Sequence, residues 1–169
     1  MTQQTDHKTV TRVNRVLGID PGYNRCGFAV ITRASGKEEL LFSECFSTPA
    51  TDTFPTRLAA LAAECRSIIE RYTPDVCALE KVYFTTNQKT AMHVAEVRGA
   101  LILTAHESGL PVHEFGPNEV KVAVAGDGAA SKRQVMLMVP RLIRVEKTIR
   151  YDDEYDAIAV ALTAGAHIH

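Results

Sequence analysis

Acidic side chains stand where apolar segments of this sequence begin or end. One apolar run ends in Asp20 just before a Pro-Gly turn, and another ends in Glu80. Asp153 and Asp156 open an apolar helical pattern near the C-terminus, and their spacing of three puts them on one helix face. An unpaired charge at the end of a buried strand costs several kcal/mol, so these acids need partners.

The types of these residues point to metal chemistry. If the two strands are neighbours, Asp20, Glu80 and Asp156 converge at one end of a sheet. Carboxylates within several ångströms of one another repel and have raised pKa values, and a divalent cation removes that repulsion. Hard oxygen ligands suit Mg²⁺ or Mn²⁺, and two such ions about 4 Å apart activate water and stabilise the leaving oxygen of a phosphodiester. With Asp153 added, the set predicts a metal-dependent phosphodiester hydrolase.

Simpler explanations exist for each acid alone. An Asp before Pro-Gly is favourable turn chemistry, so Asp20 needs no function to be explained. Acids at a helix start stabilise the helix dipole by a few tenths of a kcal/mol. Asp152 can take the role assigned to Asp153, and a helix cap would give the same pattern. The prediction therefore depends on the set of acids.

Hydrophobic periodicity predicts the elements that position these acids. Strands are expected at 15–20, 27–33, 39–47, 75–81 and 112–115. Helices are expected at 57–72, 87–107, 118–124, 132–144 with an interruption or bend near Pro140, and 153–167. An antiparallel meander continued by strand-helix-strand units gives an α/β fold, a five-stranded mixed sheet with helices on both faces.

The chain is expected to form one domain. Residues 1–12 are polar and without periodicity, which predicts a disordered N-terminal extension, and 13–169 suits a single domain. The predicted helix 87–107 is apolar on nearly all sides, so it is expected in the core or in a subunit interface. A stripe on it fits either use: Thr90, Ala91, Val94, Ala95, Arg98 and Leu101.

Composition narrows the class of protein. No window reaches the ~18 apolar residues of a membrane span, and the N-terminus lacks a signal-peptide core, so a cytoplasmic location is expected. The four cysteines are widely spaced and contain no CxxC pair, which argues against a zinc cluster. The net charge is −1, but segment 121–150 holds seven basic residues against two acids, which favours one basic face. A solvated helix surface would look the same.

Several motifs resemble those of one nuclease family and run in that family's order from about residue 15 to 167. They are Gly18-Ile19-Asp20-Pro21-Gly22, Leu79-Glu80-Lys81-Val82-Tyr83-Phe84, Asn87, Thr90-Ala91, Arg98-Gly99, Gly126-Asp127-Gly128-Ala129-Ala130-Ser131-Lys132 and Asp153-Glu154-Tyr155-Asp156-Ala157-Ile158-Ala159. The chain resembles the RuvC-type Holliday junction resolvases of the ribonuclease-H-like superfamily. Cys26 stands where the family commonly has Thr, but every catalytic acid is present.

The resemblance implies a homodimeric, Mg²⁺-dependent endonuclease that makes symmetric paired nicks across four-way DNA junctions in homologous recombination and repair. Mn²⁺ is expected to substitute, with two ions in each site. A branch-migration motor complex of RuvA and RuvB type is an implied partner. The implied metal ligands and catalytic acids are Asp20, Glu80, Asp153 and Asp156, Lys132 is an implied catalytic residue, and the implied DNA-binding residues are Tyr83, Lys121, Lys132 and Arg133.

Two other functions fit parts of the sequence. A related nuclease that processes structured RNA would use the same acids. A non-catalytic junction-binding module, or an actin-like nucleotide-binding module, would share the first motif. The actin-like module requires a second phosphate-binding loop and a longer chain, and a catalytically dead binder would be expected to have lost an acid.

Overall fold

A single five-stranded sheet forms the centre of the molecule. The computed structural model describes residues 14–34, 37–81 and 88–168, so the predicted extension 1–12 lies outside the described residues. The strands are β1 (Arg15–Asp20), β2 (Arg25–Ala34), β3 (Lys37–Ser47), β4 (Val76–Glu80) and β5 (Val112–Phe115). Their spatial order is β3-β2-β1-β4-β5. The first three are antiparallel neighbours, whereas β4 runs parallel to β1 and β5 parallel to β4, which confirms the predicted mixed sheet.

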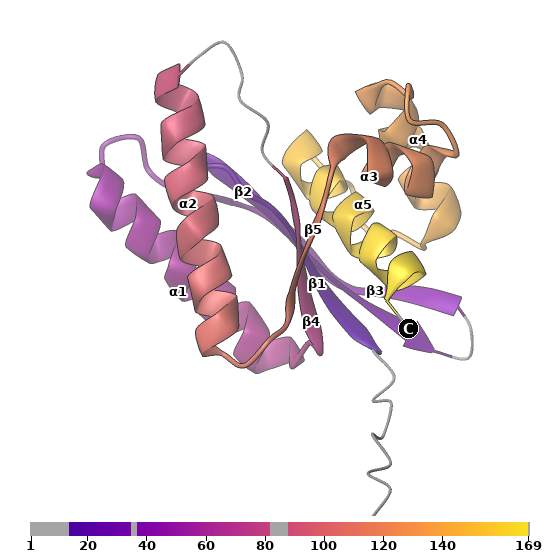
Figure 1. Cartoon of the computed structure of the whole chain (residues 1–169), viewed down its shortest axis with the longest axis horizontal. Coiled ribbons are helices and arrows are strands. Elements are labelled where there is room, and N and C mark those ends of the chain that lie inside the picture. Colours follow the sequence, from indigo (N-terminus) through magenta and orange to yellow (C-terminus); the bar gives the residue numbers. More distant parts are fainter. Residues whose placement is uncertain (1–13, 35–36, 82–87, 169) are drawn as a thin grey trace, which may run out of the picture.

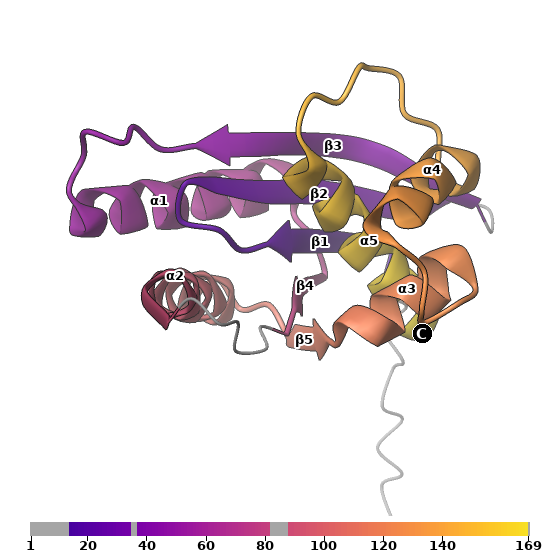
Figure 2. The same cartoon turned by 90° about the horizontal axis from the view of Figure 1, so that it is seen from above.

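Helices cover both faces of the sheet (Figure 1). The helices are α1 (Phe54–Tyr72), α2 (Gln88–Glu107), α3 (Pro117–Ala125), α4 (Lys132–Leu142) and α5 (Asp152–His167). Figure 2 shows α1 and α2 on one side of the strands and α3, α4 and α5 on the other. The predicted α/β class with helices on both faces is therefore confirmed.

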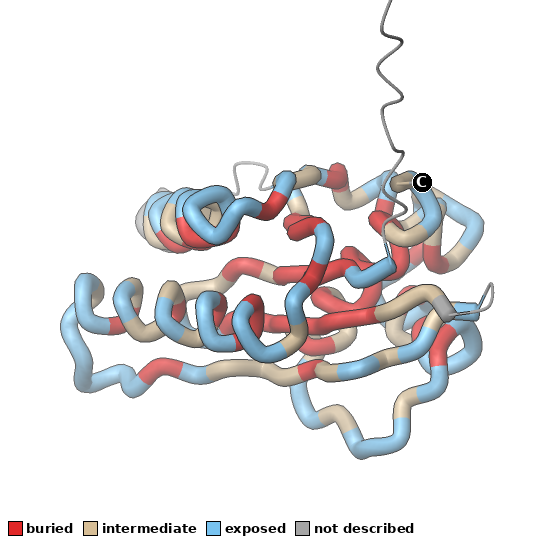
Figure 3. Tube along the Cα trace, turned by 90° about the horizontal axis from the view of Figure 1, so that it is seen from below, coloured by how far each residue is buried: buried red, intermediate tan, exposed pale blue. Residues whose placement is uncertain are grey.

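Alternation along the strands divides the core into two halves. Leu17 and Ile19 pack in the core under α1 and α2, whereas Val16 packs in the core under α5. Side chains of neighbouring strand residues point to opposite faces, so a central strand covered on both faces is apolar throughout. Figure 3 shows the buried residues concentrated on the central strands and on the helix surfaces that face them.

Helix boundaries differ slightly from the predicted ones. Helix α1 begins three residues before the predicted start, at Phe54, because Thr53 caps it by accepting from the backbone N–H of Thr56. Pro140 does not interrupt α4, which continues to Leu142. Its position in the last turn limits the loss to one backbone hydrogen bond near an end that frays anyway.

Helix α2 is not buried on all sides. Ala91, Val97 and Leu101 are buried against the sheet and α1, whereas Met92 is 64% exposed and Leu103 is 56% exposed. Two members of the predicted stripe thus serve packing within the chain, and a different apolar face points outward.

The cysteines are free thiols, and Cys26, Cys65 and Cys77 are buried among apolar side chains. Across the described ranges, no helix has both the length and the apolar character needed to cross a membrane.

Candidate active site

Strand geometry points two of the predicted acids at the same helix. Ile19 of β1 lies beside Leu79 of the parallel strand β4, so Asp20 and Glu80 end adjacent strands at the same edge. Asp20 follows Gly18 by two residues and therefore lies on the same face of β1. The α-carbon of Gly18 faces Ala157 and Ala161 of α5. The alternation of the strand therefore directs the Asp20 side chain toward α5.

Glycines let α5 approach the sheet closely. A β-carbon on Gly18 would collide with the carbonyl oxygen of Ala157, and one on Gly27 would collide with the carbonyl oxygen of Asp153. The helix surface there is also small, because Ala157 and Ala161 are both fully buried. This close packing brings the first turn of α5 to the ends of β1 and β2.

The acids are close enough to change one another's pKa. Burial raises the pKa of Asp20 from 3.8 to about 8, and the negative charges of Asp156, Glu80 and Asp153 add to the effect. Burial followed by Asp156 raises the pKa of Glu80, and burial also raises that of Asp156 despite the opposing charge of Lys132. An arrangement of this kind is unfavourable unless a cation compensates it.

Lys132 supplies positive charge to this cluster. Its Nζ lies 2.6 Å from an oxygen of Asp152 and 2.7 Å from an oxygen of Asp156. The Ser131–Gln134 capping box begins α4 at this point and so fixes where Lys132 stands. The hydrogen bond from Lys132 lowers the pKa of Asp152, and these contacts raise the pKa of Lys132 although its burial acts in the opposite direction.

Arg25 is a charged neighbour that the sequence analysis missed. Its Nε lies 2.8 Å from Oδ2 of Asp153 and its guanidinium 3.6 Å from Asp152. It also lies over the ring of Tyr151, 4.9 Å from the centroid. The alternation of side chains along β2 could have indicated this contact. Arg25 precedes Gly27 by two residues and so faces α5 as Gly27 does.

Asp152 and Asp153 share Arg25 and differ in their other partners. Asp153 contacts Arg25 and lies 3.9 Å from the thiol of Cys45, and its charge raises the pKa of Asp20. Asp152 contacts Lys132 as well as Arg25. This division favours Asp153 as the acid that belongs with Asp20.

The other three predicted DNA-binding residues differ in how they relate to the acids. Lys121 lines a pocket of about 200 Å³ with Glu80, Lys132 and Asp156, closed by Pro117, Val120 and Val135. Arg133 is exposed at the start of α4, next to Lys132 in sequence, and is not among the residues that line this pocket. Tyr83 lies outside the described residues, so its role stays a prediction.

The donor set suits a divalent cation, although its present geometry does not close around one. Within the described ranges, no three His, Cys, Asp or Glu side chains stand close enough together to ligate one ion. The physical reason is visible in the ion pairs, since Lys132 holds Asp156 and Arg25 holds Asp153. Hard carboxylate oxygens whose repulsion raises their pKa values are nonetheless ligands suited to Mg²⁺ or Mn²⁺.

A second arginine, Arg57 of α1, fixes the turn after Asp20. It is only 8% exposed, and its Nε donates to Oγ1 of Thr48 at 2.8 Å. Its Nη2 donates to the carbonyl of Tyr23 at 3.0 Å and to the side-chain oxygen of Asn24. These bonds tie the turn to the start of α1.

Comparison with known proteins identifies the family. The sequence model described as "Crossover junction endodeoxyribonuclease RuvC" matches residues 16–164. The chain belongs to the RuvC family. A RuvC from Moorella thermoacetica is 44% identical over 147 residues, which cover 87% of this chain and 88% of the relative. RuvC from Thermotoga maritima is 40% identical over 147 residues, covering 87% of this chain and 88% of the relative.

A solved structure agrees with this assignment. The structure described as "T. thermophilus RuvC in complex with Holliday junction substrate" superposes with a TM-score of 0.84 at 32% identity. The match covers 91% of this chain and 94% of the other. The predicted ribonuclease-H-like resolvase fold is confirmed, and the chain is a crossover junction endodeoxyribonuclease of a family of metal-dependent nucleases.

Proposed function

We propose that this RuvC-family enzyme resolves Holliday junctions by Mg²⁺-dependent hydrolysis, placing symmetric nicks in two strands of a four-way DNA junction. The observation that carries the proposal is the half-buried carboxylate of Asp20, whose pKa is raised by desolvation and by three converging acids. A strand end of this kind is unfavourable in isolation and becomes favourable when a cation is bound. We place the activity in homologous recombination and DNA repair.

Asp20, Glu80, Asp153 and Asp156 are the proposed ligands and catalytic acids. When bound, two divalent ions (Mg²⁺, with Mn²⁺ as a substitute) supply an activated water and stabilise the leaving oxygen. Binding requires Lys132 to release Asp156. The ammonium then remains near Asp152, beside the pocket where Lys121 stands, and both lysines can hold the scissile phosphate.

The proposed DNA surface is the side of the molecule formed by α3 and α4. Lys121, Lys132 and Arg133 lie there, on the segment whose charge is strongly basic. Phosphate contacts of this kind give affinity without sequence preference. Tyr83 remains a predicted stacking residue.

A homodimer is proposed through the outer face of α2. Met92, Ala95, Gly99 and Leu103 recur at helical spacing, and all four are exposed. Large exposed apolar side chains next to small residues suit the close approach of a second helix. Leu103→Lys is expected to convert a dimer into a monomer in light scattering, whereas Leu142→Lys on α4 leaves the mass unchanged. The RuvA and RuvB type motor and the cytoplasmic location remain predictions.

The decisive test uses Asp20→Asn with a synthetic mobile four-way junction. The variant is expected to bind the junction as the wild type does but to cut it at least about 10³-fold more slowly, since an amide is a poor Mg²⁺ ligand. Asp52→Asn, an exposed loop acid, serves as the control. Cleavage by the variant at near wild-type rate contradicts the assignment. Faster wild-type cleavage of a structured RNA than of the junction would favour the RNA-processing alternative.

A further inference from the structure

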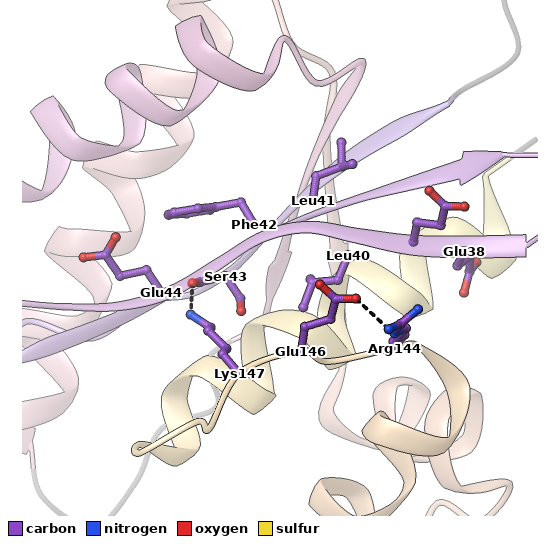
Figure 4. A pocket seen from close by; sticks show the side chains of 10 residues that line it. Glu38, Leu40, Leu41, Phe42, Ser43, Glu44, Arg144, Glu146 and Lys147 are labelled. Carbon is purple, nitrogen blue, oxygen red and sulfur yellow. Dashed lines mark hydrogen bonds and ion pairs between the residues drawn. The ribbon is translucent and has the colours of Figure 1, made fainter.

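A large groove lies along the outer edge of the sheet. It has a volume of about 860 Å³ and is lined by seven consecutive residues of β3, 38–44. Arg144, Glu146 and Lys147, from the segment between α4 and α5, form the opposite wall (Figure 4). The groove therefore runs parallel to a strand.

Strand β3 is the last strand of the sheet on this side. An edge strand presents a row of backbone N–H and C=O groups that no neighbouring strand pairs. The backbone carbonyl of Ser43 already has a partner, because Nζ of Lys147 donates a hydrogen bond to it. The same Nζ lies 2.6 Å from Glu154. The residues Glu38–Phe42 come before this contact with Lys147 and line the groove.

The charge of the groove is acidic. Four of its side chains are glutamates, at positions 38, 39, 44 and 146. Two of these glutamates have basic partners, since Arg33 lies 3.5 Å from Glu38 and Arg144 lies 3.0 Å from Glu146, while Lys147 contacts Glu154. Glu39 and Glu44 are in no ion pair among the described residues and carry the acidic character of the groove. The acidic character continues onto α1, where the charge of Glu44 helps to raise the pKa of Glu64, after the larger effect of burial.

Apolar contact is also available. Leu41 is 39% exposed and points, like Phe42, to the side of β3 away from Arg144, Glu146 and Lys147 (Figure 4). Phe42 packs there against the ring of Tyr72, so Leu41 is the apolar side chain that an added strand can contact on that side. A register shift opposite Val30 and Ile31 places a bulge at this point of β3. Bulges and like charges prevent two identical edges from pairing. The like charges do not act against an oppositely charged strand, and the bulge interrupts an added ladder only locally, at Leu41.

We propose that the outer edge of β3 is a docking site for an extended basic segment of a partner protein, which pairs with the backbone of Glu38–Phe42 as a sixth strand. Main-chain hydrogen bonds supply the affinity and alternate side chains supply the selectivity in this mode of binding. A second copy of β3 is disfavoured because its glutamates would face these glutamates, and DNA is disfavoured because the groove is acidic. The site is separate from the basic surface of α3 and α4, so a partner and DNA can be held together.

The test uses a fluorescein-labelled, capped peptide of about eight residues in which lysine alternates with valine. Two further peptides carry backbone N-methyl groups, one on every lysine and one on every valine. A docked strand uses one edge only, so one methylated peptide is expected to lose at least about tenfold in affinity while the other binds as the parent does. Glu39→Lys with Glu44→Lys is expected to weaken the parent by about tenfold or more. Asp52→Lys with Glu70→Lys, two exposed acids outside β3 and α2, is the matched control and is expected to leave peptide binding unchanged.

Amide chemical shifts locate the peptide. Changes are expected at residues 38–44 of the full-length protein. The proposal is overturned if the parent peptide fails to bind at about 1 mM, if the two methylated peptides bind equally well, or if the shift changes gather at the acids around Asp20, where a basic peptide would be held by charge alone.

Discussion

Nζ of Lys132 lies 2.7 Å from Oδ2 of Asp156 and 2.6 Å from Oδ2 of Asp152, so one ammonium joins an acid of the proposed metal site to an acid outside it. Both carboxylates are on the first two turns of α5, and the lysine is the first residue of α4. The pair therefore holds two helices together across the catalytic edge. It also keeps Lys132 within reach of a phosphate once Asp156 is engaged elsewhere.

Replacement of Lys132 by Met is expected to slow junction cleavage by about 10²- to 10³-fold, because the variant loses the positive charge closest to the proposed scissile phosphate. Single-turnover cleavage at saturating protein measures the effect without the contribution of binding. Lys37→Met, on the distant end of β3, should cut at the wild-type rate. An unchanged rate in Lys132→Met would remove this lysine from the mechanism.

The stability of the metal-free protein is expected to fall between about pH 4 and pH 8 through Asp20. Burial and the neighbouring acids raise its pKa from 3.8 to about 8, so in this window the folded state retains a proton that the unfolded state has lost. Below the window both states are protonated and there is no penalty, and above it the full penalty is present. Asp20→Asn should therefore be more stable than the wild type at pH 8, by on the order of several kcal/mol, and nearly equal to it at about pH 4.

Urea unfolding in EDTA across that pH range checks this difference. Adding Mg²⁺ at pH 8 is expected to stabilise the wild type more than the variant, because the cation offsets the repulsion that the amide lacks. A gap between the two proteins that is constant with pH would show that the Asp20 carboxylate titrates normally.

Arg25→Ala is expected to raise the Mg²⁺ concentration needed for half-maximal cleavage by about 10- to 100-fold, the usual effect of losing a residue that orients a ligand. The reason is that Arg25 holds Oδ2 of Asp153 and stacks on Tyr151 at the start of α5. A Mg²⁺ titration of single-turnover rates measures it, and Arg25→Lys should recover part of the loss. If cleavage falls without any shift in the Mg²⁺ dependence, Arg25 acts on DNA instead.

Gly27→Ala should destabilise the protein by about 1–3 kcal/mol and reduce cleavage, because the new methyl group would overlap the carbonyl oxygen of Asp153 and push α5 away from the sheet. Ser67→Ala is the control, since Ser67 is exposed on α1 and alanine is the better helix former. Urea unfolding of both variants at one protein concentration gives the comparison. Equal stability of Gly27→Ala and the wild type would mean that α5 tolerates the displacement.

The sequence was sufficient to predict the strands and helices because apolar runs and hydrophobic periodicity depend on residues close together in the chain. The apolar run that ends at Asp20 predicts β1 with its bounds, and Val112–Phe115 was likewise placed correctly. The convergence of Asp20 and Glu80 followed from one assumption, that their strands are neighbours, and the pairing of Ile19 with Leu79 meets it.

The contacts of long side chains could not be predicted in the same way. Arg25 reaches Asp153 across 128 positions of the sequence, and nothing near either residue in the sequence indicates the other. Arg57 is the first residue of the predicted helix 57–72, and nothing in the sequence marks it as buried, yet the turn it binds covers it. The direction and reach of a flexible side chain depend on the finished packing, which a periodic pattern does not contain.

The turn after Asp20 also contacts α2 and the start of α1 through aromatic rings. The ring of Tyr23 lies 5.2 Å from that of His93 on α2, and His93 lies 4.2 Å from Phe54 at the start of α1. Three rings in tilted and edge-on contact thus connect the turn that follows Asp20 to α2, the helix whose outer face is the proposed dimer surface. These contacts place α2 and the start of α1 directly against the turn that follows Asp20, so the position of that turn depends on how α2 packs.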